Sequence, residues 1–199
     1  MAKLVNWHDF NKIIREKGIR LFGSAEVRRL FGTSQVAADF LLHRYSKRGF
    51  IVRIKRGLYA LPDALPPEPF IANKIYEPSY VSLEFALSYH GVIPESVYEI
   101  TSVTPRATRR FAALDKIYSY RRIKKAAFTG YSAQKQGGEG FFMADPEKAF
   151  VDLCYFRVLD GIESPLRFKK DKINLKKAAR YAQLFSNAAL DKTIKKILR

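Results

Sequence analysis

Apolar residues in the first fifty positions recur at the spacing of α-helices and predict three of them. The first begins after Asn6, a good N-cap, and is expected to end at Gly18. The second is a short helix over residues 25–31 with Ser24 as its N-cap, followed by a tight turn at Gly32-Thr33. The third follows a cap at Thr33 or Ser34 and is closed by Lys47, Arg48 and Gly49, and its predicted buried stripe is Ala38, Leu41, Leu42 and Tyr45. A short helix, a turn with glycine and a longer helix are typical of a helix-turn-helix.

Residues 50–61 predict a β-hairpin directly after the third helix. The alternation over residues 50–55 is expected to bury Phe50, Val52 and Ile54 and to leave the residues between them exposed. A turn at Arg56-Gly57 then leads to the returning strand, residues 58–61. In this place a hairpin is the wing of a winged helix-turn-helix, and its tip carries the cations Arg53, Lys55 and Arg56.

A cluster of prolines marks a boundary after the hairpin. Pro62, Pro66, Pro67 and Pro69 fall between residues 62 and 70, where missing N–H groups and fixed φ angles are expected to exclude helix and central strand. The predicted organisation is a winged helix domain over residues 1–62, a linker over 63–69 and a larger domain over 70–199.

The larger domain mixes helical and strand patterns. Ser82 is expected to cap a helix that ends at Gly91, and Asp145-Pro146-Glu147 is a strong helix start. Predicted strands cover residues 97–103 and two parts of 111–123, residues 134–140 form a loop or hairpin tip, and two basic amphipathic helices occupy the last thirty residues. The fold class is therefore α+β: an N-terminal winged helix-turn-helix domain, then a mixed α/β C-terminal domain that ends in basic helices.

Charge points to a polyanionic partner. The 199 residues include 36 Lys and Arg against 19 Asp and Glu, a net charge of +17. The excess lies in residues 1–62 (+9), 106–135 (+8) and 169–199 (+8), with acidic segments between them. A single cysteine, Cys154, and the absence of a signal peptide or a long apolar run predict a cytoplasmic protein without a membrane partner.

These patterns nominate eight DNA-binding residues. Ser34, Gln35 and His43 lie off the buried stripe of the third helix, and Gln35 near its start is suited to adenine. Arg44 and Lys47 are expected to meet phosphates, as are the three wing cations Arg53, Lys55 and Arg56. A solvated face that serves solubility is the alternative reading of the same charges.

The residues do not indicate a catalytic or metal site. Ser82 and His90 lie eight residues apart on one predicted helix, about 12 Å of rise, so they cannot pair as nucleophile and base. Asp145, Glu147 and Asp152 are better explained as a capped helix start and a solvated carboxylate than as metal ligands. We therefore predict no enzymatic activity, no metal and no cofactor.

The order of motifs resembles the AbiEi-type antitoxins of type IV toxin–antitoxin systems in bacterial abortive infection. The resemblance rests on the winged helix, the proline-rich linker, the segment from Tyr80 to Gly91, Pro94, the strand through Thr101, and the segment from Met143 to Ala149; it covers about residues 5–160. It implies that the winged helix binds inverted repeats in promoter DNA and represses its own operon. It also implies that the C-terminal domain counters a nucleotidyltransferase-like toxin encoded alongside.

The sequence thus predicts a transcriptional regulator that binds double-stranded DNA. The alternative is an RNA-binding or nucleic-acid-processing protein without promoter specificity, in which the basic segments 106–135 and 169–199 form a continuous groove.

Overall fold

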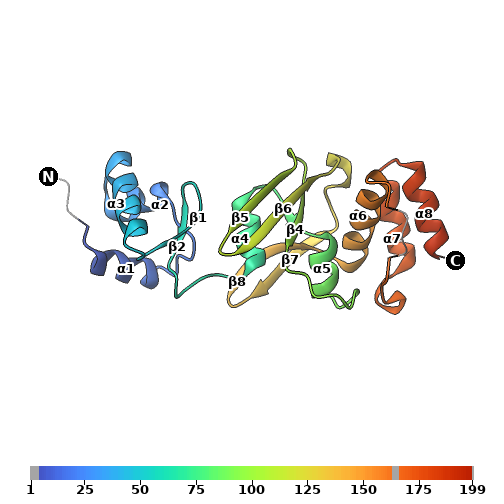
Figure 1. Cartoon of the computed structure of the whole chain (residues 1–199), viewed down its shortest axis with the longest axis horizontal. Helices are drawn as coiled ribbons and strands as arrows, with labels where there is room; N and C mark the ends of the chain where they lie inside the picture. The colour runs from blue at the N-terminus through green and yellow to red at the C-terminus, as the bar shows by residue number, and fades with distance from the viewer. Residues whose placement is uncertain (1–4, 163–165, 199) are drawn as a thin grey trace. The chain divides into compact units, whose positions relative to one another are not determined.

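The computed structural model describes residues 5–162 and 166–198. The chain divides into two compact units, Met1–Pro66 and Pro67–Arg199 (Figure 1). The first unit contains α1 (Trp7–Glu16), α2 (Ser24–Phe31), α3 (Gln35–Lys47), β1 (Val52–Lys55) and β2 (Leu58–Ala60). This is the helix order and the terminal hairpin of a winged helix-turn-helix, as the sequence predicts.

Local capping explains where the helices of the first unit begin. The Asn6 side chain accepts a hydrogen bond from the backbone N–H of Asp9, and the Ser34 hydroxyl accepts one from Ala37, so both predicted caps are confirmed. The prediction that Ser24 caps α2 is wrong. Gly23 is the N-cap, and its own N–H donates to the Glu26 carboxylate at 2.8 Å, while Ser24 is the first helical residue.

An aromatic cluster forms the core of the first unit. Phe10 is fully buried and stacks on Phe31, and its ring meets those of Phe22 and Tyr45 edge-on. The predicted stripe of α3 is buried in this cluster: Ala38, Leu41, Leu42 and Tyr45. Burial of this stripe fixes which side of α3 faces outward.

The hairpin has the predicted turn but a different buried face. Ile51 and Ile54 are 2% and 3% exposed, whereas Phe50 and Val52 are only half-buried, so the strict alternation is wrong. The cause is an irregularity in the pairing of β1 with β2, where the register shifts between Arg53 and Lys55. Arg53 and Arg56 are exposed as predicted, but Lys55 is half-buried.

The start of α2 packs directly against the turn of the hairpin. A Cβ atom on Gly23 would lie 2.4 Å from the carbonyl oxygen of Gly57, closer than any real contact of this kind. Just before it, Phe22 and Tyr59 exchange backbone hydrogen bonds of 3.0 and 2.8 Å. The backbone therefore sets the position of the hairpin relative to the start of α2.

The second unit is built on a six-stranded mixed sheet in the order β5-β6-β4-β3-β8-β7. Its strands are β3 (Tyr80–Val81), β4 (Ile100–Thr104), β5 (Arg109–Ala113), β6 (Lys116–Arg122), β7 (Tyr131–Gln136) and β8 (Glu139–Ala144). Its α-helices are α4 (Glu68–Ile75), α5 (Leu83–Tyr89), α6 (Pro146–Leu159), α7 (Leu175–Gln183) and α8 (Ala188–Leu198), with short 3-10 turns at Lys125–Ala127 and Lys170–Lys172. Figure 1 shows α4 on one side of the sheet and α5 and α6 on the other.

Three features of the second unit differ from the sequence prediction. Helix α4 begins inside the proline-rich segment from which helix was excluded; Pro69 is tolerated because it lies in the first turn, where its missing N–H needs no partner. Strand β4 begins three residues later than predicted, at Ile100. Residues 134–136 belong to strand β7, and only Gly137 and Gly138 form the turn to β8.

Candidate nucleic-acid interface

A cleft separates the start of α3 from the hairpin within the first unit. It is lined by side chains of α2, α3 and both strands, and by the turn between the strands: Ser24, Gln35, Asp39, Arg53, Arg56, Gly57 and Tyr59. Three of the eight nominated residues, Gln35, Arg53 and Arg56, therefore meet here. In a winged helix this is the region that faces a DNA duplex, with the helix toward the bases and the wing toward the backbone.

A hydrogen-bond network organises one wall of this cleft. The Gln35 side-chain amide donates to both carboxylate oxygens of Asp39, at 3.1 and 2.9 Å, and its carbonyl accepts from Arg28 at 3.3 Å. The Ser24 hydroxyl also donates to Asp39. Hydrogen bonds from Ser24 and then Gln35 lower the pKa of Asp39, so this carboxylate stays ionised at neutral pH. Because both ends of the Gln35 side chain are engaged, reading an adenine would require it to exchange these partners.

The other nominated residues of α3 lie at its start or along its outward side. Ser34 uses its hydroxyl to cap the helix. His43 and Lys47 are exposed. Arg44 is also exposed, with its guanidinium 5.3 Å from the centre of the Tyr45 ring and a long 3.5 Å contact to the Val5 carbonyl.

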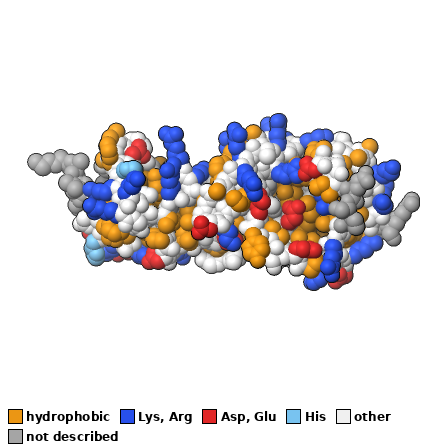
Figure 2. Space-filling view, viewed as in Figure 1, with side chains coloured by type: hydrophobic (Ala, Val, Ile, Leu, Met, Phe, Trp, Pro, Cys, Tyr) orange, Lys and Arg blue, Asp and Glu red, His pale blue; other side chains and the backbone are white. Residues whose placement is uncertain are grey.

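Sequence reasoning missed two apolar residues on the same outward side of α3. Val36 and Phe40 are 64% and 70% exposed, and they lie four residues apart. Figure 2 shows apolar side chains at the surface over α3 and Lys and Arg side chains over the hairpin. The signal was available, because both positions fall outside the predicted buried stripe of the helix.

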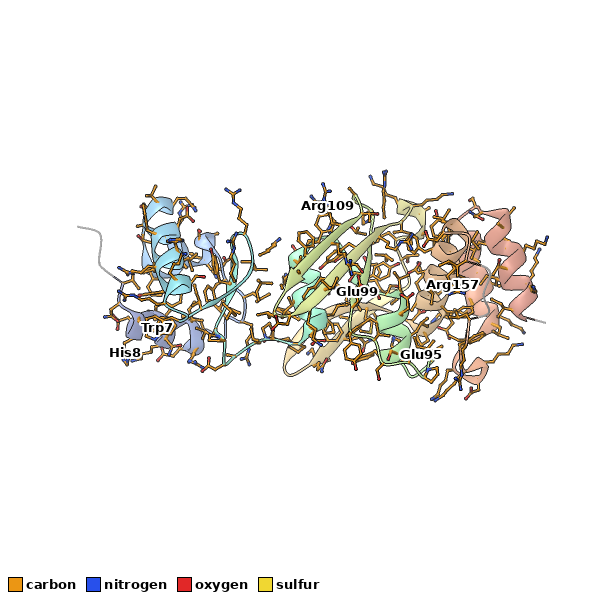
Figure 3. All side chains as sticks on the ribbon, in the orientation of Figure 1. Trp7, His8, Glu95, Glu99, Arg109 and Arg157 are labelled. Carbon is orange, nitrogen blue, oxygen red and sulfur yellow. The ribbon has the colours of Figure 1, made fainter. Side chains whose placement is uncertain are left out.

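Several cations of the basic segment 106–135 are engaged by other groups of the second unit. Arg110, Lys116 and Arg121 form ion pairs with Glu99, Glu68 and Asp160, at 3.3, 3.1 and 2.6 Å. In the same basic segment, Lys124 donates to the carbonyl of Phe185 at 2.5 Å. Arg109, by contrast, extends outward from the start of β5 (Figure 3). Much of the basic segment 106–135 is thus used within the unit itself.

The two side chains of the second unit that could suggest a catalytic pair, Ser82 and His90, each contact a different partner within the fold. The Ser82 hydroxyl donates to buried Asp152 at 2.8 Å and does not cap α5, although Ser82 holds the predicted N-cap position. His90 Nε2 lies 2.9 Å from the Ala144 carbonyl oxygen.

The candidate metal carboxylates face cations, and the expectation of a solvated carboxylate is wrong for Asp152, which is fully buried beside Lys148. Asp145 caps α6 as predicted, and with Glu147 it pairs with Lys177 at 2.9 and 3.0 Å. Within residues 5–162 and 166–198, no group of three His, Cys, Asp or Glu side chains is placed to hold a metal ion. Over the same residues, none of the helices has both the length and the apolar character needed to cross a bilayer.

Comparison with known protein families gives a match within the first unit. Residues 12–62 match the AbiEi antitoxin family of transcriptional regulators. The match runs from the middle of α1 through the returning strand and contains all eight nominated residues, from Ser34 to Arg56. No curated protein matches the chain.

The AbiEi match confirms the resemblance inferred from the sequence for this segment. It ends four residues before Pro66, the last residue of the first unit. The surface formed by α3 and the hairpin therefore lies within a segment typical of transcriptional regulators.

Proposed function

We propose that the protein is a DNA-binding transcriptional regulator that represses its own operon by binding inverted repeats in the promoter. The observation that carries the proposal is the exposed face of α3 beside a cationic hairpin, inside a segment that matches AbiEi regulators. Helix α3 would enter the major groove, and Arg53 and Arg56 would lie along the sugar–phosphate backbone.

The state of these cations favours this surface over the paired cations of β5 and β6. Lys47, Arg53 and Arg56 are exposed, and among the described residues they form no ion pair. A cation that is not already paired with a carboxylate can bind a phosphate and release a counterion without first breaking an ion pair inside the protein. Arg110, Lys116 and Arg121 of the second unit would have to give up their ion pairs first.

A mobility-shift titration of the full-length protein tests the proposal. At about 0.15 M salt, duplex DNA from upstream of its own gene should bind about 10³-fold or more tightly than a shuffled duplex of the same composition. Equal affinity for the two duplexes would contradict promoter recognition. Tighter binding to RNA or single strands would favour the RNA-binding alternative.

We extend the proposal to antitoxin activity, which rests on the family resemblance alone. The second unit would support protection against a nucleotidyltransferase-like toxin encoded alongside. Co-expression of the neighbouring reading frame with the full-length protein should restore growth that the frame alone arrests. Continued arrest, with both proteins present at comparable levels, would count against the antitoxin role and leave the DNA-binding proposal standing.

A further inference from the structure

The outward side of α3 carries an apolar pair that the fold does not use. Phe40 is 70% exposed, whereas the other aromatic side chains described in the first unit are buried or half-buried. They form the ring cluster around Phe10: Trp7, Phe22, Phe31, Tyr45 and Phe50, with Tyr59 packed against the same core. Val36, one turn before Phe40, is 64% exposed. An exposed valine and an exposed phenylalanine that are neighbours on one helix suggest a partner surface.

The surroundings of this pair are cationic. Arg28 reaches α3 through its hydrogen bond to Gln35, and Arg53 and Arg56 line the cleft beside Gln35 and Asp39. Lys47 follows on α3 two turns after Phe40. A second copy of the same face would bring these cations against one another, whereas a polyanion complements them.

The spacing of the pair fits the stacking of base pairs. Residues four apart on a helix are separated by about 6 Å along its axis, and base pairs repeat about every 3.4 Å along a strand. Val36 and Phe40 are therefore close enough to reach neighbouring base pairs. Both lie in the first half of α3, the part of a recognition helix that reaches base edges in helix-turn-helix proteins.

The major groove offers one apolar group to such side chains, the C5-methyl of thymine. We propose that Val36 and Phe40 read thymine methyl groups, so that the recognition sequence contains thymines at neighbouring base pairs. This inference rests on the proposed DNA-binding function and identifies the base that its recognition helix selects. Because the Gln35 side chain is hydrogen-bonded to Arg28 and Asp39, apolar contacts would supply the discrimination between bases that Gln35 does not.

Replacing thymine by deoxyuridine tests this contact, because it removes the methyl group and keeps every hydrogen-bonding atom of the base edge. Duplexes are first selected from a randomised library with the full-length protein. Each thymine of the best duplex is then replaced singly by deoxyuridine, and affinities are measured by titration. We expect one or two positions at which the replacement weakens binding by about fourfold, the factor that corresponds to one buried carbon.

Protein variants show which side chain makes the contact. Phe40→Ala should remove the deoxyuridine effect at one position while the slope of affinity against salt stays unchanged. Leu65→Ala, at another exposed apolar residue outside α3, is the matched control and should keep the full effect. Circular dichroism checks the fold, which an exposed position leaves intact.

Three results would overturn the inference. A selected duplex whose affinity is insensitive to deoxyuridine at every thymine excludes methyl reading but leaves DNA recognition in place. A self-association that sedimentation detects in the unaltered protein and that Phe40→Ala abolishes assigns the face to a second copy. A selection from the randomised library that enriches no sequence would contradict both the proposed sequence-specific DNA binding and this inference.

Discussion

Within residues 5–66, the structure describes no buried charged side chain, whereas the second unit buries both Lys148 and Asp152 completely. The Lys148 ammonium pairs with the Asp152 carboxylate, which also accepts hydrogen bonds from Tyr80 at 3.1 Å and Ser82 at 2.8 Å. Burial lowers the pKa of Lys148 and raises that of Asp152, while each group favours the charged form of the other. The second unit thus uses charges to join α6 to β3 and the start of α5.

Exposed cations of the two units also differ in whether they are paired. Arg53 and Arg56 of the first unit point into solvent beside the cleft, while Arg121 of the second unit pairs with Asp160 and lies 4.1 Å from the centre of the Phe156 ring. The first unit pairs Arg15 with Asp63 but leaves Arg53 and Arg56 beside the cleft available to a ligand. The comparison therefore teaches that a basic segment indicates binding only where its charges are not already engaged.

The largest expected effect is a loss of stability of the second unit when the buried pair of Lys148 and Asp152 is broken. Asp152→Ala leaves the Lys148 ammonium buried without its carboxylate, which should lower the free energy of unfolding of the second unit by about 3–5 kcal/mol. Chemical denaturation followed by far-UV circular dichroism measures the loss. The fluorescence of Trp7, the single tryptophan, reports on the first unit, whose transition should not move.

The control removes both charges. Lys148→Met with Asp152→Leu replaces the pair by apolar groups and should recover most of the lost stability. A loss below about 1 kcal/mol in Asp152→Ala would show that the pair does not hold the unit together.

A backbone contact should have the next largest effect. Gly23→Ala places a methyl group where the carbonyl oxygen of Gly57 lies, so the hairpin must move away from α2. Overpacking of this kind costs about 1–3 kcal/mol, and the shifted hairpin should bind DNA more weakly. Ala25→Gly, at an exposed position two residues later, is the comparison for an unspecific change at the start of α2. Full DNA affinity in Gly23→Ala would separate the hairpin from the interface.

The smallest effect concerns the carboxylate on the recognition helix. Asp39→Asn removes a negative charge next to the cleft and should raise affinity for random duplex about twofold, the effect of one charge roughly 10 Å from a phosphate in water. Asp160→Asn makes the same charge change in the second unit and should leave affinity unaltered. An equal rise in both variants would mean that net charge alone controls binding.

The sequence predicts most of the first unit because its signals are local. Asn6 and Ser34 act as caps through bonds to an N–H three residues on, which is a matter of spacing alone, and Asp145 in the second unit does the same. The sequence does not show that Gly23 is the N-cap of α2, because Gly23 is required by its close approach to Gly57, a contact between segments distant in sequence.

What the sequence missed depends on tertiary contacts. Strand β7 (Tyr131–Gln136) is polar and lies at the edge of the sheet, so it shows no alternation of buried residues. The hydrogen-bond network that runs from Arg28 through α3 back to Ser24 joins α2 to α3. The sequence indicates only one part of it, the four-residue spacing of Gln35 and Asp39 on a single helix. Nothing in the composition of residues 106–135 distinguishes the cations engaged in ion pairs from the free ones.

The central claim is that DNA lies against the first unit and not against the basic segment of the second. Two triple variants of the full-length protein test it: Lys47, Arg53 and Arg56 to Ala, and Arg109, Arg122 and Lys125 to Ala. All six residues are exposed, and each variant removes three positive charges. The measurement is the slope of log affinity against log salt concentration, to which each phosphate contact contributes about 0.9. The first variant should flatten the slope by about 2 to 3, and the second should leave it nearly unchanged. The reverse result would place the nucleic acid on the second unit and contradict the account.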